Sequence, residues 1–175
     1  YKRKNNFIWS VQREKGLKKT LDTWVNYIYP KNKKNKLFIF GIDKNKFRKL
    51  KNYYKKYNII FLGRVKKDVL IKTYKTSLGM ICLGYDETFC LNAIEANACG
   101  LPVITFGKTA LKDIIKNNYN GIVVKDYNSL SIKILELLNK NQLLKKKYIN
   151  NSINSSKKYH FNKVKKSWFN LFYNK

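Results

Sequence analysis

Residues 84–106 have the sequence GYDETFCLNAIEANACGLPVITF, and this stretch decides the fold. An apolar run at 78–83 precedes its loop and a second run at 103–106 ends it. Between the runs, apolar residues recur at helical spacing: Leu91, Ile94, Ala98 and Leu101. Gly100 is suited to end the helix and Pro102 to open the next strand. The stretch therefore predicts a βαβ unit, and open parallel sheets of such units bind ligands at the carboxyl ends of their strands.

Two glutamates in this stretch, Glu87 and Glu95, are eight residues apart. Glu87 falls in the loop, and the backbone N–H groups around 89–91 open the helix and can face an anion. Glu95 lies about one turn further in. A phosphorylated ligand at the helix start would place one sugar beside each carboxylate, which can accept hydrogen bonds from two neighbouring hydroxyls. Taken alone, the pair also fits two solvated side chains on an amphipathic helix.

Apolar runs and helical periodicity alternate along the whole chain. Six runs predict strands, at 7–11, 37–41, 59–62, 78–83, 103–106 and 121–124. Helical patterns lie between and after them, at 17–28, 44–57, 67–76, 110–116, 129–138 and 143–153. Asp43 and Asp126 are suited to cap two of these helices. The alternation predicts an α/β fold, a Rossmann-like parallel six-stranded sheet with helices on both faces and right-handed crossovers.

The chain is strongly basic. Its 38 Lys and Arg against 10 Asp and Glu give a formal net charge of +28. Such a charge attracts phosphates, nucleic acid or an anionic membrane surface. The excess is almost all Lys, together with many Asn, Ile and Tyr, a mixture that an A/T-rich genome also produces. A basic nucleic-acid-binding module remains an alternative, although the basic residues are spread over nearly every helix and no RRM, KH or helix-turn-helix pattern occurs.

Cysteine and histidine usage argues against a metal site. Cys82, Cys90 and Cys99 form no CxxC pair, and His160 is the single histidine. An odd count of cysteines without a signal peptide indicates reduced thiols in a reducing compartment. We therefore expect no metal and a cytoplasmic protein. No apolar run approaches the length of a membrane span, so any membrane association would be peripheral.

The stretch that contains Glu87 and Glu95 resembles the E-x7-E element of retaining glycosyltransferases of the GT-B fold, family 4. The residues that match the pattern E-G-F-G-L-x-x-x-E-A-x-A-x-G-x-P-V include Glu87, Phe89, Leu91, Glu95, Ala96, Gly100, Pro102 and Val103. Thr88 and Cys90 replace two family glycines, where side chains would crowd the loop that approaches the donor. The resemblance implies that Glu87 holds the donor sugar and Glu95 the nucleotide ribose, with the loop residues Thr88, Phe89, Cys90 and Leu91 around the donor.

Two further loops carry the same resemblance. Lys15, with Gly16 and Leu17 behind it, matches the family's G-R-…-E-K-G-L run, which faces the donor diphosphate. Arg13 is a displaced candidate for the arginine of that run. Residues 63–65, Gly63, Arg64 and Val65, resemble the G-x-V segment beside the nucleotide base, where Arg64 would stack on the base or join the phosphates. A solvent-facing lysine and a surface arginine are the competing interpretations.

The resemblance covers only the second half of a two-domain enzyme. It implies a donor-binding domain at 1–158 and a C-terminal helix at 159–175 that packs toward an N-terminal acceptor domain. The implied reaction is metal-independent and needs no cofactor: it moves a hexose or N-acetylhexosamine from a UDP- or GDP-sugar, with UDP favoured, to a saccharide or lipid-linked acceptor. Surface polysaccharide assembly, such as lipopolysaccharide biosynthesis at the cytoplasmic face of the membrane, is the implied setting. A noncatalytic nucleotide-sugar-binding domain remains a second alternative.

Overall fold

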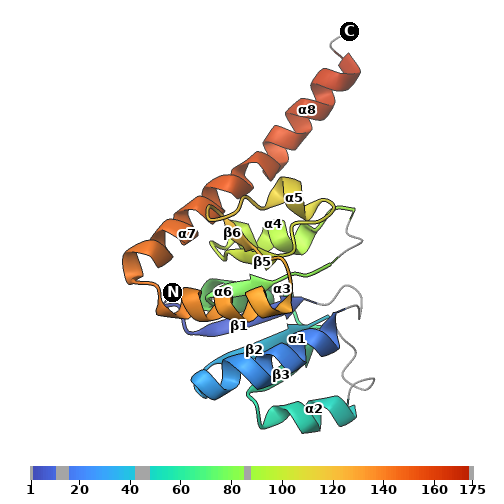
Figure 1. Ribbon diagram of the computed structural model, residues 1–175. Coiled ribbons are helices and arrows are strands. Elements are labelled where there is room, and N and C mark those ends of the chain that lie inside the picture. Colours follow the sequence, from blue (N-terminus) through green and yellow to red (C-terminus); the bar gives the residue numbers. More distant parts are fainter. Residues whose placement is uncertain (1, 11–15, 42–47, 85–87, 174–175) are drawn as a thin grey trace.

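The computed structural model describes residues 2–10, 16–41, 48–84 and 88–173 of the 175-residue chain. Its centre is a parallel six-stranded sheet with the strand order β3-β2-β1-β4-β5-β6 (Figure 1). The strands are β1 (Asn6–Ser10), β2 (Lys36–Phe40), β3 (Ile59–Gly63), β4 (Gly79–Ile81), β5 (Val103–Thr105) and β6 (Gly121–Val123). The predicted fold class is confirmed, and each predicted strand overlaps an observed one.

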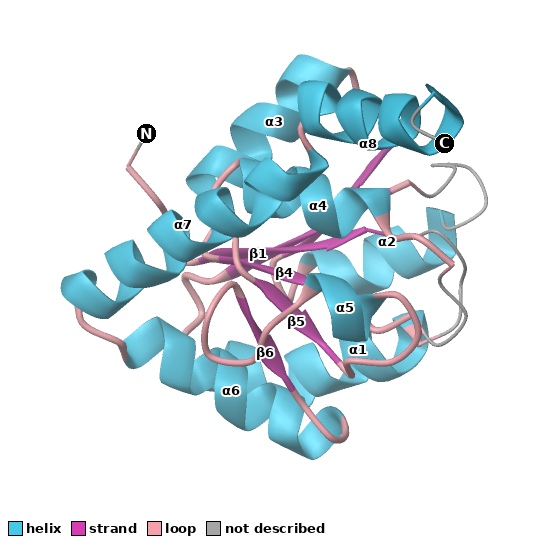
Figure 2. Ribbon diagram, turned by 90° about the horizontal axis from the view of Figure 1, so that it is seen from above, coloured by secondary structure: helices cyan, strands magenta, loops and turns pink. Residues whose placement is uncertain are grey.

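Helices cover both faces of the sheet (Figure 2). Those on one face are α1 (Leu17–Thr23), α2 (Arg48–Lys55) and α6 (Tyr127–Asn139). Those on the other are α3 (Lys67–Thr76), α4 (Leu91–Ala98), α5 (Leu111–Ile114) and most of α7 (Gln142–Ser156). A short 3-10 turn, η3 (Lys157–Tyr159), then leads to α8 (Phe161–Tyr173), which runs away from the sheet.

The strands are apolar at successive positions because both of their faces are buried. In β1, Phe7 and Trp9 point into the hydrophobic cluster beneath α1 and α6. Ile8, between them, points into the cluster beneath α3 and α4. Side chains of a strand alternate between faces, so a continuous apolar run supplies both layers of the core.

The helix predicted at 17–28 changes its hydrogen bonding along its length. It is α-helical through Thr23 and continues as a π-helical turn, η1 (Trp24–Ile28). The N–H of Tyr29 donates to the carbonyl of Trp24, five residues back, and a 3-10 turn, η2 (Tyr29–Lys31), follows. Asp126 caps α6 as predicted, whereas Asp43 lies outside the described residues.

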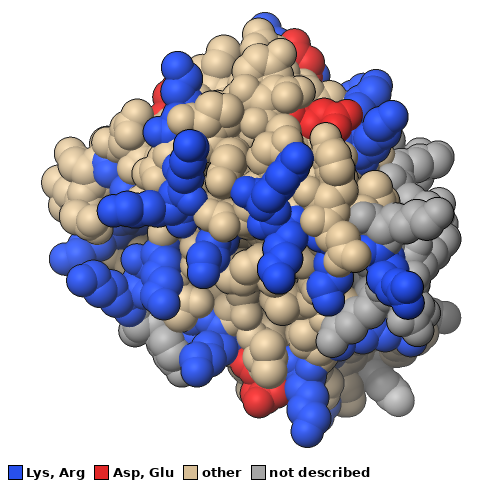
Figure 3. Space-filling model, turned by 90° about the horizontal axis from the view of Figure 1, so that it is seen from below, with Lys and Arg blue, Asp and Glu red and all other residues tan. Residues whose placement is uncertain are grey.

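Lysines dominate the face that Figure 3 shows, on the side of the molecule where α2 lies. They are spread over this face, with few acidic side chains among them. Within the described residues, no helix is both long enough and apolar enough to cross a bilayer.

Candidate functional site

The strand order creates a switch point between β1 and β4. From β1 the chain builds outward through β2 to β3, then returns to β4 on the other side of β1 and continues to β6. The connections that leave β1 and β4 therefore go to opposite faces of the sheet. In open α/β sheets, the crevice at the carboxyl ends of two such strands is the usual ligand site.

Three of the predicted site residues, Arg13, Lys15 and Glu87, lie outside the described residues. The predictions made for them therefore stay predictions. The residues that follow the first loop are described: Gly16 has a φ of +88° and precedes α1. A side chain at Gly16 would be strained by this φ, and its Cβ would lie 2.8 Å from the Tyr127 hydroxyl. The chain therefore needs glycine where the β1–α1 loop enters the helix.

Helix α4 begins immediately after the β4 loop. Cys90 is its N-cap and makes no capping hydrogen bond through its side chain, and the N–H of Ala93 donates to the Cys90 carbonyl at 3.1 Å. The first turn contains no acidic residue. The positive end of the helix dipole therefore lies at the carboxyl end of the sheet, and no residue of the first turn of α4 is a carboxylate that could neutralise it, an arrangement suited to an anion.

Glu95 stands on the outer face of α4. Ala93, Ile94, Ala96 and Asn97 are buried against the sheet, whereas Leu91 and Glu95 are exposed. Residues four apart share one face of a helix, so the Glu95 side chain lies one turn along from Leu91. Phe89 and Leu91 are both more than half exposed, which places apolar surface beside the carboxylate.

The negative charge of Glu95 affects the pKa values of two nearby side chains, Tyr74 and Cys99. Burial raises the pKa of the Tyr74 hydroxyl on α3, and the negative charge of Glu95 raises it further. The same charge adds to the raised pKa of Cys99, whose main cause is burial. The Glu95 carboxylate is therefore close enough to Tyr74 and Cys99 to act on both electrostatically.

The two residues that replace family glycines differ in placement. Thr88 is exposed on the loop, whereas Cys90 is fully buried, with its Sγ 3.5 Å from the Sγ of Cys82 at the end of β4. Cys90 has a φ of −83°, which any L-residue adopts. Its side chain therefore packs in the core beneath α4 and does not occupy the outer surface of the loop.

The segment after β3 shares a hydrophobic cluster with α4. Gly63 has a φ of +70°, which favours glycine at the end of the strand. Arg64 is exposed, and Val65 packs against the cluster that contains Cys90 and Ile94. The structure thus brings the predicted base-binding segment and the Glu95 helix to the same face of the sheet.

Two polar contacts that fix α4 were not predicted. The Arg3 guanidinium donates to the carbonyls of Tyr74, Ser77 and Cys99, and so ties the ends of α3 and α4 together. Burial lowers its pKa to about 10. In α4, Asn97 accepts a hydrogen bond from the Asn120 side-chain amide at 2.7 Å. Burial of such polar residues is uncommon, and nothing in their sequence spacing signals it.

No metal site is apparent in the part of the chain that the structure describes, where no three His, Cys, Asp or Glu side chains gather closely enough to hold an ion. The described site consists instead of a helix N-terminus, one exposed carboxylate and exposed apolar side chains. Such an arrangement can bind an anionic ligand that also carries hydroxyl groups.

Comparisons with known proteins identify the fold and the family of the chain. The family model described as glycosyl transferases group 1 matches residues 3–155. No curated protein sequence matches the chain. Among solved structures, a TarM variant from S. aureus in complex with fondaparinux, α-GlcNAc-glycerol and UDP has a TM-score of 0.81 and 21% identity, and the match covers 99% of this chain and 36% of that one.

Two further solved structures show the same fold. WaaG, a glycosyltransferase involved in lipopolysaccharide biosynthesis, has a TM-score of 0.75 and 17% identity, with 99% of this chain and 48% of that one covered. The C-terminal domain of LpcC, a glycosyl transferase group 1 family protein from Francisella tularensis, has a TM-score of 0.72 and 21% identity, with 91% and 88% covered. The chain thus spans half or less of TarM and WaaG but nearly all of the LpcC domain. Because the family model covers most of its residues, the chain belongs to the glycosyl transferases group 1 family.

Proposed function

We propose that this chain is the donor-binding half of a retaining, metal-independent glycosyltransferase that uses a UDP- or GDP-sugar. UDP is favoured, and the transferred group is a hexose or an N-acetylhexosamine. The observation that carries the proposal is the exposed Glu95, one turn into a helix that begins beside the β1–β4 switch point and has no acidic residue in its first turn. Family membership supports sugar transfer as the reaction.

In the proposed complex, each segment of the site contacts a different part of the donor. The diphosphate lies at the start of α4, near Cys90, where the helix dipole and the basic Arg13 and Lys15 stabilise its charge. Glu95 accepts hydrogen bonds from the ribose hydroxyls, and Glu87 accepts them from the donor sugar. The base lies along 63–65, and the exposed side chains of Thr88, Phe89 and Leu91 border the site.

The reaction needs stabilisation of the leaving group. As the glycosidic bond breaks, negative charge grows on the diphosphate, and the proposed role of Arg13, Lys15 and the α4 terminus is to stabilise it without a metal. Loss of one such contact costs roughly 3–4 kcal/mol by analogy with lost oxyanion donors. We assign no nucleophile: the acceptor hydroxyl attacks on the face from which the diphosphate leaves, and the leaving phosphate takes its proton.

The acceptor is a saccharide or a lipid-linked saccharide held mainly by an N-terminal domain. Helix α8 is suited to pack on that domain, because it extends from the sheet and carries exposed Phe161, Trp168 and Phe172. The division at 158 and 159 between the two parts remains our prediction. TarM was solved with UDP, and WaaG is involved in lipopolysaccharide biosynthesis. By analogy we place this chain in surface polysaccharide assembly, in the cytoplasm or peripherally on the membrane.

A nucleotide panel read by thermal shift tests the proposal. We expect UDP or GDP to raise the melting temperature of the 175-residue chain, because a ligand that binds only the folded state stabilises it. The Glu95→Ala and Lys15→Ala variants should lose the shift. Glu136→Ala on α6, which removes an exposed carboxylate far along the chain, should keep it. No shift with any nucleotide at millimolar concentration would contradict the proposal.

An activity assay separates binding from transfer. With UDP-sugars and saccharide acceptors, the isolated chain should bind the donor yet transfer no sugar, because the acceptor site lies in the other domain. Transfer by the pure 175-residue chain would show that the acceptor site is already present in it.

A further inference from the structure

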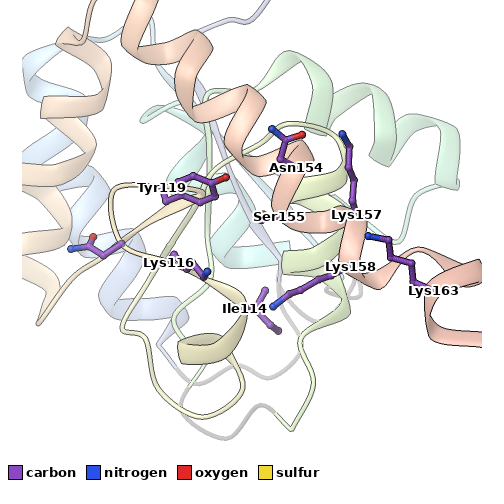
Figure 4. A pocket seen from close by; sticks show the side chains of 9 residues that line it. Ile114, Lys116, Tyr119, Asn154, Ser155, Lys157, Lys158 and Lys163 are labelled. Carbon is purple, nitrogen blue, oxygen red and sulfur yellow. The ribbon is translucent and has the colours of Figure 1, made fainter. Parts of the chain in front are cut away.

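A second site lies where α7, η3 and α8 meet the segment between α5 and β6 (Figure 4). We call this hollow the lysine pocket. Its volume is about 610 Å³, within the range of small-molecule sites. Its walls carry Ile114, Lys116, Asn117, Tyr119, Asn154, Ser155, Lys157, Lys158 and Lys163.

The charge in the lysine pocket is uncompensated. Lys116 comes from one wall, and Lys157, Lys158 and Lys163 come from the other. Within the described residues, none of the four ammonium groups pairs with a carboxylate. In Figure 4, Lys116 and Lys158 reach toward each other across the hollow. Four like charges repel one another unless an anion lies between them.

The remaining walls supply neutral polar groups and an aromatic ring. The side-chain amides of Asn117 and Asn154 can donate hydrogen bonds to hydroxyl or phosphate oxygens. The Ser155 hydroxyl already donates to the Ser152 carbonyl at 2.9 Å and therefore helps to hold the wall in place. Tyr119 is 40% exposed, so its ring is available to cover the apolar face of a ligand. This mixture of ammonium, amide, hydroxyl and aromatic groups suits a ligand that carries both an anion and a polyol.

The base of the lysine pocket is fixed by a hydrogen-bond network. The Asn120 side-chain amide donates to the side-chain oxygens of Asn97 and Ser155, at 2.7 and 2.8 Å, and to the Ile114 carbonyl at 2.9 Å. The N–H of Lys116 donates back to the Asn120 side-chain oxygen at 2.7 Å. Both walls are therefore tied to the same buried asparagine, which keeps the pocket formed without a ligand.

We propose that the lysine pocket binds a phosphorylated sugar, with the phosphate among Lys116, Lys158 and Lys163 and the sugar against Tyr119 and the amides. This site differs from the nucleotide-sugar site proposed above and does not depend on it. The two are neighbours: Lys157 and Lys158 of η3 line the pocket, whereas Tyr159 of η3 packs on Phe89 of the β4–α4 loop, with ring centroids 6.0 Å apart.

The test is a titration of the ¹⁵N-labelled chain, followed by its amide chemical shifts. Glucose 6-phosphate should give saturable shifts centred on 114–120 and 154–163, and glucose should give none there. The triple variant Lys116→Gln, Lys158→Gln, Lys163→Gln should bind at least about tenfold more weakly, because each lost charge-assisted contact can account for that factor. The Glu95→Ala variant should bind glucose 6-phosphate as tightly as the parent, which separates this site from the proposed nucleotide site.

A matched control variant loses the same number of positive charges, but outside the lysine pocket. This control is the triple variant Lys72→Gln, Lys146→Gln, Lys147→Gln, which removes three exposed lysines outside the pocket. Its affinity for glucose 6-phosphate should stay within about twofold of the parent's. An equal loss in both triple variants would overturn the proposal in favour of net charge alone. Equally tight binding of inorganic phosphate would overturn the sugar part. Pocket-dependent binding to phosphatidylglycerol vesicles without glucose 6-phosphate binding would assign the pocket to a lipid headgroup instead.

Discussion

Among single residues, Tyr74 has a buried hydroxyl for which the described part of the chain offers no hydrogen-bond partner. The side chain projects from α3 into the hydrophobic cluster that this helix covers, and is 1% exposed. Burial raises the pKa of this hydroxyl, and the charge of Glu95 adds to the effect, so the group stays protonated and neutral. A buried polar group without a partner loses the hydrogen bonds that it makes to water in the unfolded chain.

Replacing Tyr74 by Phe should therefore stabilise the fold. We expect Tyr74→Phe to raise the free energy of unfolding by about 1 kcal/mol, because it removes an unsatisfied hydroxyl and keeps the ring. Urea denaturation measures the change. Tyr54→Phe is the control, because the Tyr54 hydroxyl donates to Asp22 at 3.4 Å and its removal should not stabilise. A destabilised Tyr74→Phe variant would indicate that the hydroxyl has a partner, such as an ordered water.

At the scale of elements, helix α6 has a cap that depends on pH. An Asp126 carboxylate oxygen accepts from the Ser129 N–H at 2.7 Å, and the Ser129 hydroxyl accepts from the Asp126 N–H at 3.0 Å. These two hydrogen bonds form a capping box. Hydrogen bonds from the Ser129 backbone and side chain lower the pKa of Asp126 below its usual 3.8.

Acid should therefore weaken α6 through Asp126. A carboxyl whose folded pKa is lowered contributes its stability above the unfolded value, near 3.8, and loses it as the pH falls through the lower folded value. The Asp126→Asn variant keeps an acceptor oxygen at the cap, but this acceptor does not titrate. The free energy of unfolding of the variant should therefore decrease less than that of the parent when the pH is lowered from neutral to acid. Denaturant unfolding at a series of pH values measures this difference. Parallel curves for the two proteins would contradict the prediction.

Element types and order followed from the sequence, because runs such as 37–40 are buried on both faces. The helix at 91–98 was also predicted, but its buried face was only partly right: Ile94 is buried, whereas Leu91 and Ala98 are exposed. The resemblance also pointed to Glu95 and 63–65. The side-chain partners were not predictable. Asn97 and Asn120 are 23 residues apart, and Arg3 and Cys99 are 96 apart, so these pairings depend on strand order. The Cys82–Cys90 contact likewise depends on the path of the loop between them.

At the scale of the whole molecule, the charge is the dominant feature. A net charge of +28 in 175 residues gives an electrostatic attraction to anionic surfaces that does not depend on any one side chain. The lysines on the face in Figure 3 are spread and do not gather in one stripe. Spread lysines suit a broad anionic surface, such as the cytoplasmic leaflet, where each nearby lysine contributes about 1 kcal/mol.

The 175-residue chain should therefore co-sediment with phosphatidylglycerol vesicles and not with phosphatidylcholine vesicles. Raising the ionic strength from about 0.01 M to about 0.15 M shortens the Debye length from about 30 Å to about 8 Å, and should release most of the bound protein. Because the attraction is distributed, both lysine triple variants described above should bind the vesicles almost equally and only slightly less than the parent. Binding that is insensitive to lipid charge or to salt would exclude an electrostatic membrane role, and the basic surface would then need another explanation.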